Sequence, residues 1–539
     1  MSQAKKQNYL HGAAIMTGTT VLVKIAAFMY KFPLGSMSLL GDEGYAHFLV
    51  AYNVYSFFLT IATAGFPVAL SRMISEADTL RREAQVRRIF RTAGGMLGVM
   101  GALFTLIMIL FNRQISAVFG DEQARYCMVA LAPAVVLVCI TSAFRGYCQG
   151  RGNMIPTAFG QVVEECGKLL IGLSLTFILI RMGKGLPIAA AGAIFGVTAG
   201  AAGALIYMFL YKRKNYPEAP YGVEDVPDSR STILRRFLQI GIPIAIGSSV
   251  LSLVNLLDNA LCLNRLQSAA GFAETEAHIL YGAYGKAQTF YNLPSYFITP
   301  LTLSVVPAIA SNMVRRYRDE ASKIAESALR MASVIALPMG VGLFVLAKPI
   351  FQVIYWGSNP AGPQLLRTLG IASYFVCMAL MCNAVLQASG REQLPIISII
   401  AGGIVKIGVN WVLVGNPSIN ISGAPIGSIL AFGVMCVIDY LFLCRALKHA
   451  PRLSRVLGAP LLSAIPMGVA AWAVYGLASR VTGESRIGML AAMLASIVVA
   501  VVVYVIMIGV TRAVTMEDME LIPKGEKIGK LLHLHKKSR

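Results

Sequence analysis

Apolar runs of about 20 residues recur along the whole of the 539-residue chain. A helix of that length crosses a hydrocarbon core, where every backbone polar group must bond within its own segment. Since 56% of the residues are hydrophobic and only 14% are charged, we expect an all-α polytopic membrane protein. About fourteen spans are predicted, near 12–32, 45–70, 93–111, 126–147, 156–180, 188–211, 237–262, 279–310, 329–350, 367–387, 394–414, 424–444, 456–478 and 488–510.

Basic residues are unevenly distributed among the predicted loops. With both termini in the cytoplasm, 33 of the 47 lysines and arginines fall inside and 10 fall outside. The outer loops carry carboxylates such as Asp42, Asp121 and Glu274. The positive-inside rule therefore predicts this orientation and accounts for the net charge of +21. We expect no nucleic-acid partner, because the basic loops lack interleaved aromatic residues.

Separate sequence matches share one offset of 239 or 240 residues. The segment YNVYSFFLTIATAGFP from Tyr52 resembles YNLPSYFITPLTLSVVP from Tyr291, and QGRGNMIP ending at Pro156 resembles QASGREQLP ending at Pro395. Six spans per repeat would give two lobes of the same orientation, related by an axis along the membrane normal. Chance similarity among apolar helices is the alternative.

This repeat predicts the domain organisation. An N-terminal lobe at 1–211 and a C-terminal lobe at 237–446, each of six helices, flank a cytoplasmic linker at 212–236. Two further helices at 447–511 and a basic cytoplasmic tail at 512–539 follow. A cleft between two such lobes is the expected binding site of a cargo.

Four lysines lie deep within predicted spans, namely Lys24, Lys168, Lys286 and Lys406. A cation there costs at least about 2.5–3.5 kcal/mol, so we expect these lysines to face a hydrated chamber that suits an anionic cargo. In the first span, Lys24 and Lys31 share a polar stripe and would bridge a phosphate group. For Lys31, the alternative is extension to the lipid headgroups.

Acidic and amide residues accompany two of the lysines. Glu164 precedes Lys168 by four positions, which favours an intrahelical ion pair with either a structural or a coupling role. Asp258 in the seventh span has two candidate roles. It would pair with Lys406 of the eleventh span, the preferred interpretation, or bind Na⁺ together with Asn410.

Further amide groups extend this polar surface. Asn53 in the second span, and Lys286 with Asn292 in the eighth, would line a wall for a sugar-bearing cargo. Packing between helices is the alternative.

Motifs of enzyme chemistry are absent from the sequence. It contains no phosphate-cradling Gly-Lys-Ser/Thr loop, no zinc-ligand spacing and no nucleophile elbow. We therefore expect no catalytic residue and no cofactor. Transport would depend on Na⁺, H⁺ or the membrane potential.

The segments GTTVLVKIAAFMYKFPLGSMSLLGDEGYAHFLVAYNVYSFFLTIATAGFPVALSRMISE and FRGYCQGRGNMIPTAFGQVVEECGKL resemble the MurJ-like lipid II flippases of Gram-positive bacteria and the related stage V sporulation protein B group. Both groups belong to the multidrug/oligosaccharidyl-lipid/polysaccharide (MOP) flippase superfamily. The resemblance covers essentially the whole chain. It implies a MATE-like fold of fourteen helices in two lobes. It also implies alternating-access transfer of a polyprenyl-diphosphate-linked peptidoglycan precursor to the outer leaflet of the bacterial cell membrane, in support of cell-wall biogenesis and cell shape.

The resemblance also implies roles for individual residues. Basic residues on helices 1, 2 and 8 contact the diphosphate in that family, and the matching positions here are Lys24, Lys31 and Lys286. The family's cation site uses acidic and amide residues of helices 7 and 11, which match Asp258 and Asn410. The implied partners are a lipid-linked oligosaccharide diphosphate, membrane lipids and cell-wall synthesis proteins.

Three alternatives to lipid II transport remain. They are a flippase for a polysaccharide precursor, a multidrug or metabolite antiporter of the same fold, and a scaffold without transport activity. Lysines in the cavity argue against an exporter of cationic drugs, which would favour carboxylates. A scaffold would not need buried lysines.

Overall fold

The computed structural model describes residues 9–216, 226–483 and 485–515, and all regular structure within these ranges is helical. Twelve helical stretches in these ranges are long and apolar enough to cross a membrane. The chain is therefore a multi-pass all-α membrane protein, as predicted. The predicted spans at 12–32 and 156–180 fall on helical segments outside these twelve, so the count of fourteen stays a prediction.

Contacts divide the chain into two compact units. Unit 1 comprises Met1–Gln267 with Ala273–His278, and unit 2 comprises Ser268–Phe272 with Ile279–Arg539. This division falls later than the predicted linker at 212–236. Residues 217–225 of that linker and 516–539 of the predicted tail lie outside the described residues.

Helix α10 (Arg230–Ser268) explains the position of this boundary, because it packs on the helices that precede it. The rings of Phe237 and Phe66 lie 5.5 Å apart. At Gly65 the two backbones approach so closely that an added Cβ would lie 2.2 Å from the carbonyl oxygen of Gly241. The first residues of α10, placed in the linker by the sequence pattern, are thus part of unit 1.

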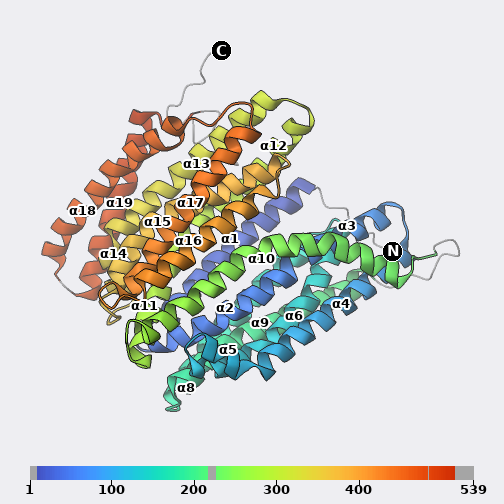
Figure 1. Ribbon diagram of the computed structural model, residues 1–539, viewed down its shortest axis with the longest axis horizontal. Helices are drawn as coiled ribbons and strands as arrows, with labels where there is room; N and C mark the ends of the chain where they lie inside the picture. Colours follow the sequence, from blue (N-terminus) through green and yellow to red (C-terminus); the bar gives the residue numbers. More distant parts are fainter. Residues whose placement is uncertain (1–8, 217–225, 484, 516–539) are drawn as a thin grey trace. The chain divides into compact units, whose positions relative to one another are not determined.

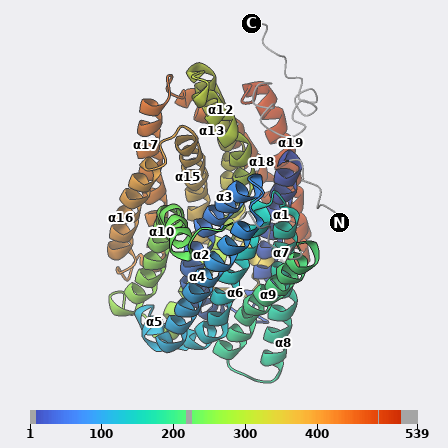
Figure 2. The same cartoon turned by 90° about the vertical axis from the view of Figure 1, so that its right-hand side faces the viewer.

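Unit 1 is a bundle in which α6 occupies the centre and contacts α2, α3, α4 and α9 (Figures 1 and 2). Of its 26 residues, 16 are buried, which is typical of a helix surrounded by others. Before α10, the helical elements of unit 1 are α1 (Tyr9–Leu34), α2 (Glu43–Ala64), α3 (Phe66–Thr79), α4 (Glu83–Leu110), α5 (Asn112–Val118), η1 (Glu122–Ala124), α6 (Arg125–Gly150), α7 (Ile155–Gly167), η2 (Lys168–Gly172), α8 (Leu173–Arg181) and α9 (Leu186–Asn215).

Unit 2 is built around α15, which contacts α12, α13 and α17. The last two helices pack on each other, and α18 also packs on α13. Helix α11 (Glu274–Tyr291) begins in unit 1 and continues into unit 2. The remaining helical elements are α12 (Leu293–Val314), α13 (Arg318–Val345), α14 (Ala347–Ile354), α15 (Gly362–Ala388), α16 (Leu394–Leu413), η3 (Asn420–Ser422), α17 (Gly423–Ala446), η4 (Ser454–Gly458), α18 (Ala459–Thr482) and α19 (Arg486–Thr511).

The order of helices repeats along the chain. The predicted spans 45–70 and 279–310 each break before a proline, Pro67 in α3 and Pro294 in α12, since proline is accommodated in the first turn of a helix. A long helix then runs into a short one, α4 into α5 and α13 into α14. The loops after α6 and α15 both turn at a glycine of positive φ, Gly152 and Gly390.

The loop between α6 and α7 closes one end of unit 1 through Arg151. Its guanidinium donates to Asp78 Oδ1 at 2.8 Å and to Glu83 Oε1 at 2.7 Å. Burial alone would lower the pKa of Arg151, but hydrogen bonding to Glu83 and the nearby charges raise it well above its ordinary value. This end of unit 1 is thus held by a charge-assisted network.

Asp121, between α5 and η1, lies at the other end of unit 1, where α4 ends and α6 begins. Its Oδ1 accepts a hydrogen bond from the backbone N–H of Ala124 at 3.0 Å. Burial alone would raise the pKa of Asp121, but the hydrogen bond and charge of His47, together with His278, hold it below its ordinary value. The carboxylate is therefore charged near neutral pH.

We expect Gly200 to be essential for the packing of α9 against α7. A Cβ at this position would lie 2.2 Å from the carbonyl oxygen of Glu164, a backbone atom that cannot turn away. Gly200→Ala should therefore lower the apparent melting temperature of the detergent-purified protein, at a cost of about 1–3 kcal/mol. Gly95→Ala in α4 is the control, because nothing lies within 4 Å of its added Cβ. Equal melting of both variants would contradict the prediction.

Candidate functional site

A cluster of charged side chains in unit 1 joins α1, α6 and α7, and we call it the Lys168 cluster. Its members are Lys31, Arg145, Glu164, Glu165 and Lys168. The Lys168 Nζ lies 2.7 Å from Glu165 Oε2, and Arg145 Nη2 lies 2.7 Å from Glu164 Oε2. The cluster thus holds three basic groups and two carboxylates, so a net positive charge remains when all are ionised.

The local fold places Lys168 at this position. It begins the π-helical turn η2, which interrupts α7–α8 where glycines of α9 allow close approach. Its ammonium lies 5.5 Å from the ring centroid of Tyr30 in α1, within the range of a cation–π contact. The Tyr30 hydroxyl in turn donates to the carbonyl of Ala193 in α9 at 3.0 Å. Three helices therefore fix the environment of this lysine.

The predicted partner of Lys168, Glu164, is wrong. Lys168 pairs with Glu165, three positions before it, while Glu164 pairs with Arg145 of α6. The reason is competition from a neighbouring helix, because Arg145 lies within reach of Glu164. The helical spacing alone allowed either glutamate.

Lys31 shares this environment and points toward α2. Its Nζ lies 6.0 Å from the ring centroid of Tyr52, and its charge interacts with those of Lys168 and Glu165. Asn53, the neighbour of Tyr52 in sequence, is half-buried, as is Lys24 two turns earlier in α1. The structure thus brings Lys31 and Lys168 into one cluster, and it places Lys24 and Asn53 on the helices that carry it.

Lys286 in unit 2 is completely buried. Its Nζ donates to Ser358 Oγ at 3.3 Å and lies 5.0 Å from the ring centroid of Tyr355. Asn292 ends the same helical stretch, and its amide donates to the carbonyl of Gln288 at 2.8 Å. Lys286 is thus held by a hydroxyl and an aromatic ring. The side-chain amide of Asn292 instead donates a hydrogen bond to the backbone of the helix before it.

The predicted coupling residues occupy both units. Asp258 is buried in α10 of unit 1, and Lys406 and Asn410 are buried one turn apart in α16 of unit 2. Asn410 lies directly against α17, where a Cβ at Gly427 would be 2.0 Å from its Oδ1. The Asp258–Lys406 pair and the Na⁺ site both stay predictions.

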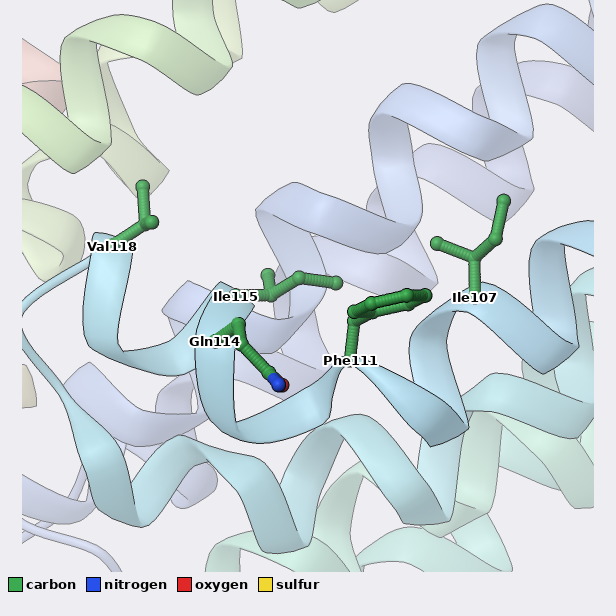
Figure 3. Close-up of a pocket in the computed structure, with 5 residues that line it drawn as sticks. All are labelled: Ile107, Phe111, Gln114, Ile115 and Val118. Carbon is green, nitrogen blue, oxygen red and sulfur yellow. The ribbon is translucent and has the colours of Figure 1, made fainter.

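A shallow apolar hollow lies at the corner between α4 and α5. Figure 3 shows the residues that line it, Ile107, Phe111, Gln114, Ile115 and Val118. These side chains offer no cation to a diphosphate. The hollow is therefore distinct from the Lys168 cluster.

Sequence reasoning missed two members of the Lys168 cluster. Arg145 lies near the end of the predicted span 126–147, where it counts with the cytoplasmic basic residues, and Glu165 shares a helical face with Glu164, which has the better spacing to Lys168. A search for intramembrane arginines would have found the first. Nothing in the sequence identifies Glu165, rather than Glu164, as the partner of Lys168.

Comparison with solved structures establishes the fold. A solved structure of lipid II flippase MurJ, in an inward closed conformation, matches with a TM-score of 0.68 at 14% identity, covering 92% of this chain and 98% of that one. An inward-facing MATE family transporter of the MOP superfamily matches with a TM-score of 0.65 at 16% identity, covering 80% and 97%. The predicted MATE-like fold is confirmed.

Sequence comparison gives the family. Residues 9–313 match the polysaccharide biosynthesis protein family, and the chain belongs to it. Stage V sporulation protein B of Bacillus subtilis (strain 168) is 26% identical over 459 residues, which cover 84% of this chain and 85% of the relative. Lipid II flippase MurJ of the same organism is 24% identical over 425 residues, with coverage of 75% and 77%. The chain is thus a member of the polysaccharide biosynthesis protein family that has the fold of the MurJ and MATE structures.

We predict that Glu165 neutralises Lys168 within the bundle. Glu165→Gln would leave a buried ammonium without its carboxylate and should cost about 3 kcal/mol, seen as a lower melting temperature. The double variant with Lys168→Gln should recover much of this loss. The control is Glu320→Gln, which breaks an exposed ion pair with Lys323 of the same spacing and should cost at most about 0.5 kcal/mol. Absence of recovery in the double variant would contradict the pairing.

Proposed function

We propose that this chain is a flippase that moves a polyprenyl-diphosphate-linked peptidoglycan precursor, lipid II or a close relative. Transfer would run from the inner to the outer leaflet of a bacterial cytoplasmic membrane by alternating access, with both termini in the cytoplasm. The observation that carries the proposal is the burial of lysines in both units, with Lys286 completely enclosed and Lys31 beside Lys168. Cations held inside a membrane protein are suited to an anionic headgroup.

In this proposal the lysines bind the diphosphate. Lys24 and Lys31 of unit 1 and Lys286 of unit 2 supply positive charge to the phosphate oxygens, as point charges rather than as bidentate forks. Asn53 and Asn292 provide amide groups for the saccharide. Membrane lipids and cell-wall synthesis proteins are the proposed partners. Relatives named lipid II flippase support this substrate class.

Transport of a polysaccharide precursor is the second candidate. The family is described by polysaccharide biosynthesis, and stage V sporulation protein B is similar to this chain over most of its length. Both candidates share a polyprenyl diphosphate and differ in the glycan. An antiporter of cationic drugs is less favoured, because the buried lysines would repel such a cargo.

The deciding experiment is depletion of the protein in its native host, followed by a leaflet-resolved assay of lipid-linked precursors. Accumulation of lipid II in the inner leaflet would support the proposal. Accumulation of another polyprenyl-diphosphate glycan would favour the second candidate. Unchanged leaflet distributions of all such precursors would refute both.

Replacement of the lysines tests their role directly. Lys24→Ala and Lys286→Ala should each abolish complementation of the depleted host while the protein still accumulates in the membrane, because each removes a cation for the diphosphate. Lys→Arg at either position should retain partial activity, since the charge is kept. Lys448→Ala is the control, as this lysine is half exposed and pairs with Asp319. Normal complementation by both alanine variants would refute the role of these lysines.

Energy coupling through Asp258 and Lys406 makes a separate prediction. A buried carboxylate should be either the partner of a lysine or a ligand of a cation. If the two residues pair, Asp258→Asn with Lys406→Gln should recover much of the transport lost by each single variant, and transport should not depend on Na⁺. If Asp258 binds Na⁺ with Asn410, transport should follow the ion gradient and the double variant should be no better than Asp258→Asn. We expect the first outcome, and Na⁺-dependent transport without recovery would contradict it.

A further inference from the structure

Two histidines and an aspartate from distant parts of the sequence meet inside unit 1. His47 of α2, Asp121 before η1 and His278 of α11 are all buried, and one potential ligand atom of each lies within 4.8 Å of the others. His47 Nδ1 lies 2.7 Å from Asp121 Oδ2, and His278 Nε2 lies 3.8 Å from Asp121 Oδ1. The cluster sits at the end of the bundle opposite Arg151, apart from the Lys168 cluster.

The two histidines occupy the same position relative to the start of their helices. Helix α2 begins at Glu43 and carries its histidine at the fifth residue, and α11 begins at Glu274 and does the same. Each motif reads Glu-x-x-Ala-His. Both copies of the motif therefore place an imidazole next to the same carboxylate, that of Asp121. Packing of apolar helices does not require such an arrangement.

The loop that carries Asp121 is held in place by neighbouring groups. Gly120 adopts a φ of +69°, and its carbonyl accepts a hydrogen bond from Gln267 Nε2 at 2.7 Å. Asn264 donates to the carbonyl of Val118. The His278 Nε2 also lies 3.4 Å from the Gly120 oxygen. Such outer contacts fix the orientation of a ligand group before any ion binds.

Hydrogen bonding alone leaves this cluster incomplete. His47 donates a hydrogen bond to the Asp121 carboxylate through Nδ1, yet its Nε2 is buried and has no hydrogen-bond partner among the described residues. Buried polar atoms in proteins are nearly always satisfied. The described residues therefore do not account for all the polar contacts of this cluster.

We propose that His47, Asp121 and His278 bind a divalent transition-metal ion, with Zn²⁺ as the ion that the ligands suit best. Two imidazoles and one carboxylate form a ligand set typical of Zn²⁺, and they do not suit Mg²⁺ or Ca²⁺, which prefer oxygen ligands. Ligands about 2.0–2.2 Å from a tetrahedral zinc ion lie roughly 3.3 Å apart. The present separations lie on either side of this value, 2.7 Å from His47 Nδ1 to Asp121 Oδ2 and 3.8 Å from His278 Nε2 to Asp121 Oδ1, so binding requires the side chains to adjust. Water or the Gly120 carbonyl completes the coordination.

The bound metal would cross-link three segments of unit 1. It would join the start of α2, the loop before η1 and the first residues of α11, beyond which the chain continues into unit 2. The ion therefore acts as a structural clamp on the start of α11. Under the orientation proposed above, this end of unit 1 faces the outside of the cell.

The test is metal binding by the full chain, purified without a histidine tag and stripped with a chelator. His533 and His535 of the C-terminal segment are first replaced by Ala to remove a competing His-x-His pair. Calorimetric titration with Zn²⁺, absorption spectra with Co²⁺ as a probe, and melting temperature with and without Zn²⁺ or Mg²⁺ are then measured. The variants are His47→Gln, His278→Gln and Asp121→Asn. His449→Gln is the matched control, since His449 also contacts an aspartate, Asp319, at 2.8 Å but is exposed.

We expect one Zn²⁺ per chain, the absorption of tetrahedral Co²⁺, and a melting temperature raised by Zn²⁺ but not by Mg²⁺. Each ligand variant should weaken Zn²⁺ binding by more than about 100-fold, beyond the loss typical of an outer contact, while His449→Gln should bind normally. If a variant does not fold, the Co²⁺ spectrum of the parent chain and the rise of its melting temperature with Zn²⁺ still test whether the site binds a metal ion. No stoichiometric binding by the parent chain, or equal binding by the folded ligand variants, would overturn the proposal.

Discussion

Charges inside this protein must find partners within the protein, because lipid offers neither hydrogen bonds nor counterions. Lys168 and Arg145 each meet a carboxylate at 2.7 Å. The same requirement acts on neutral groups, since Thr198 of α9 donates to the carbonyl of Ala130 in α6 at 2.7 Å. The arrangement of α6, α7 and α9 therefore depends on these polar contacts as well as on apolar packing.

Close packing makes these polar contacts attainable. Helices in a membrane gain no hydrophobic driving force from one another, so small residues at the contact surface contribute through backbone proximity. Gly196 and Gly200 of α9 face Gly172 and Glu164 with no room for a Cβ. This proximity brings the π-helical turn at Lys168 against the bundle, where Tyr30 and Glu165 receive the ammonium. The position of the buried Lys168 ammonium thus depends on the close helix packing that the glycines of α9 allow.

The helices could be predicted because the membrane makes hydrophobicity and length sufficient criteria. The breaks before Pro67 and Pro294 are also encoded locally, although the predicted spans ran across them. Partner choice could not be predicted, because Glu164 and Glu165 are both within helical reach of Lys168 and only Arg145 of α6 decides between them. The His47–Asp121–His278 cluster was likewise hidden. Its first two ligands alone are 74 residues apart and have no local spacing motif.

The distribution of carboxylates distinguishes two kinds of lysine in unit 1. Lys168 is neutralised by Glu165, so its charge is largely used by the fold. Among the described residues, Lys31 forms no salt bridge and contacts the face of Tyr52, which stabilises an ammonium without cancelling its charge. Replacement of Lys31 would thus remove charge available to an anion, whereas replacement of Lys168 would first disturb the helix contacts around it. If a Lys168 variant loses function, the amount of folded protein must therefore be measured before the lysine is assigned to the diphosphate. Lys31 can be assigned from function alone, because its charge is not needed for a salt bridge within the described part of the fold.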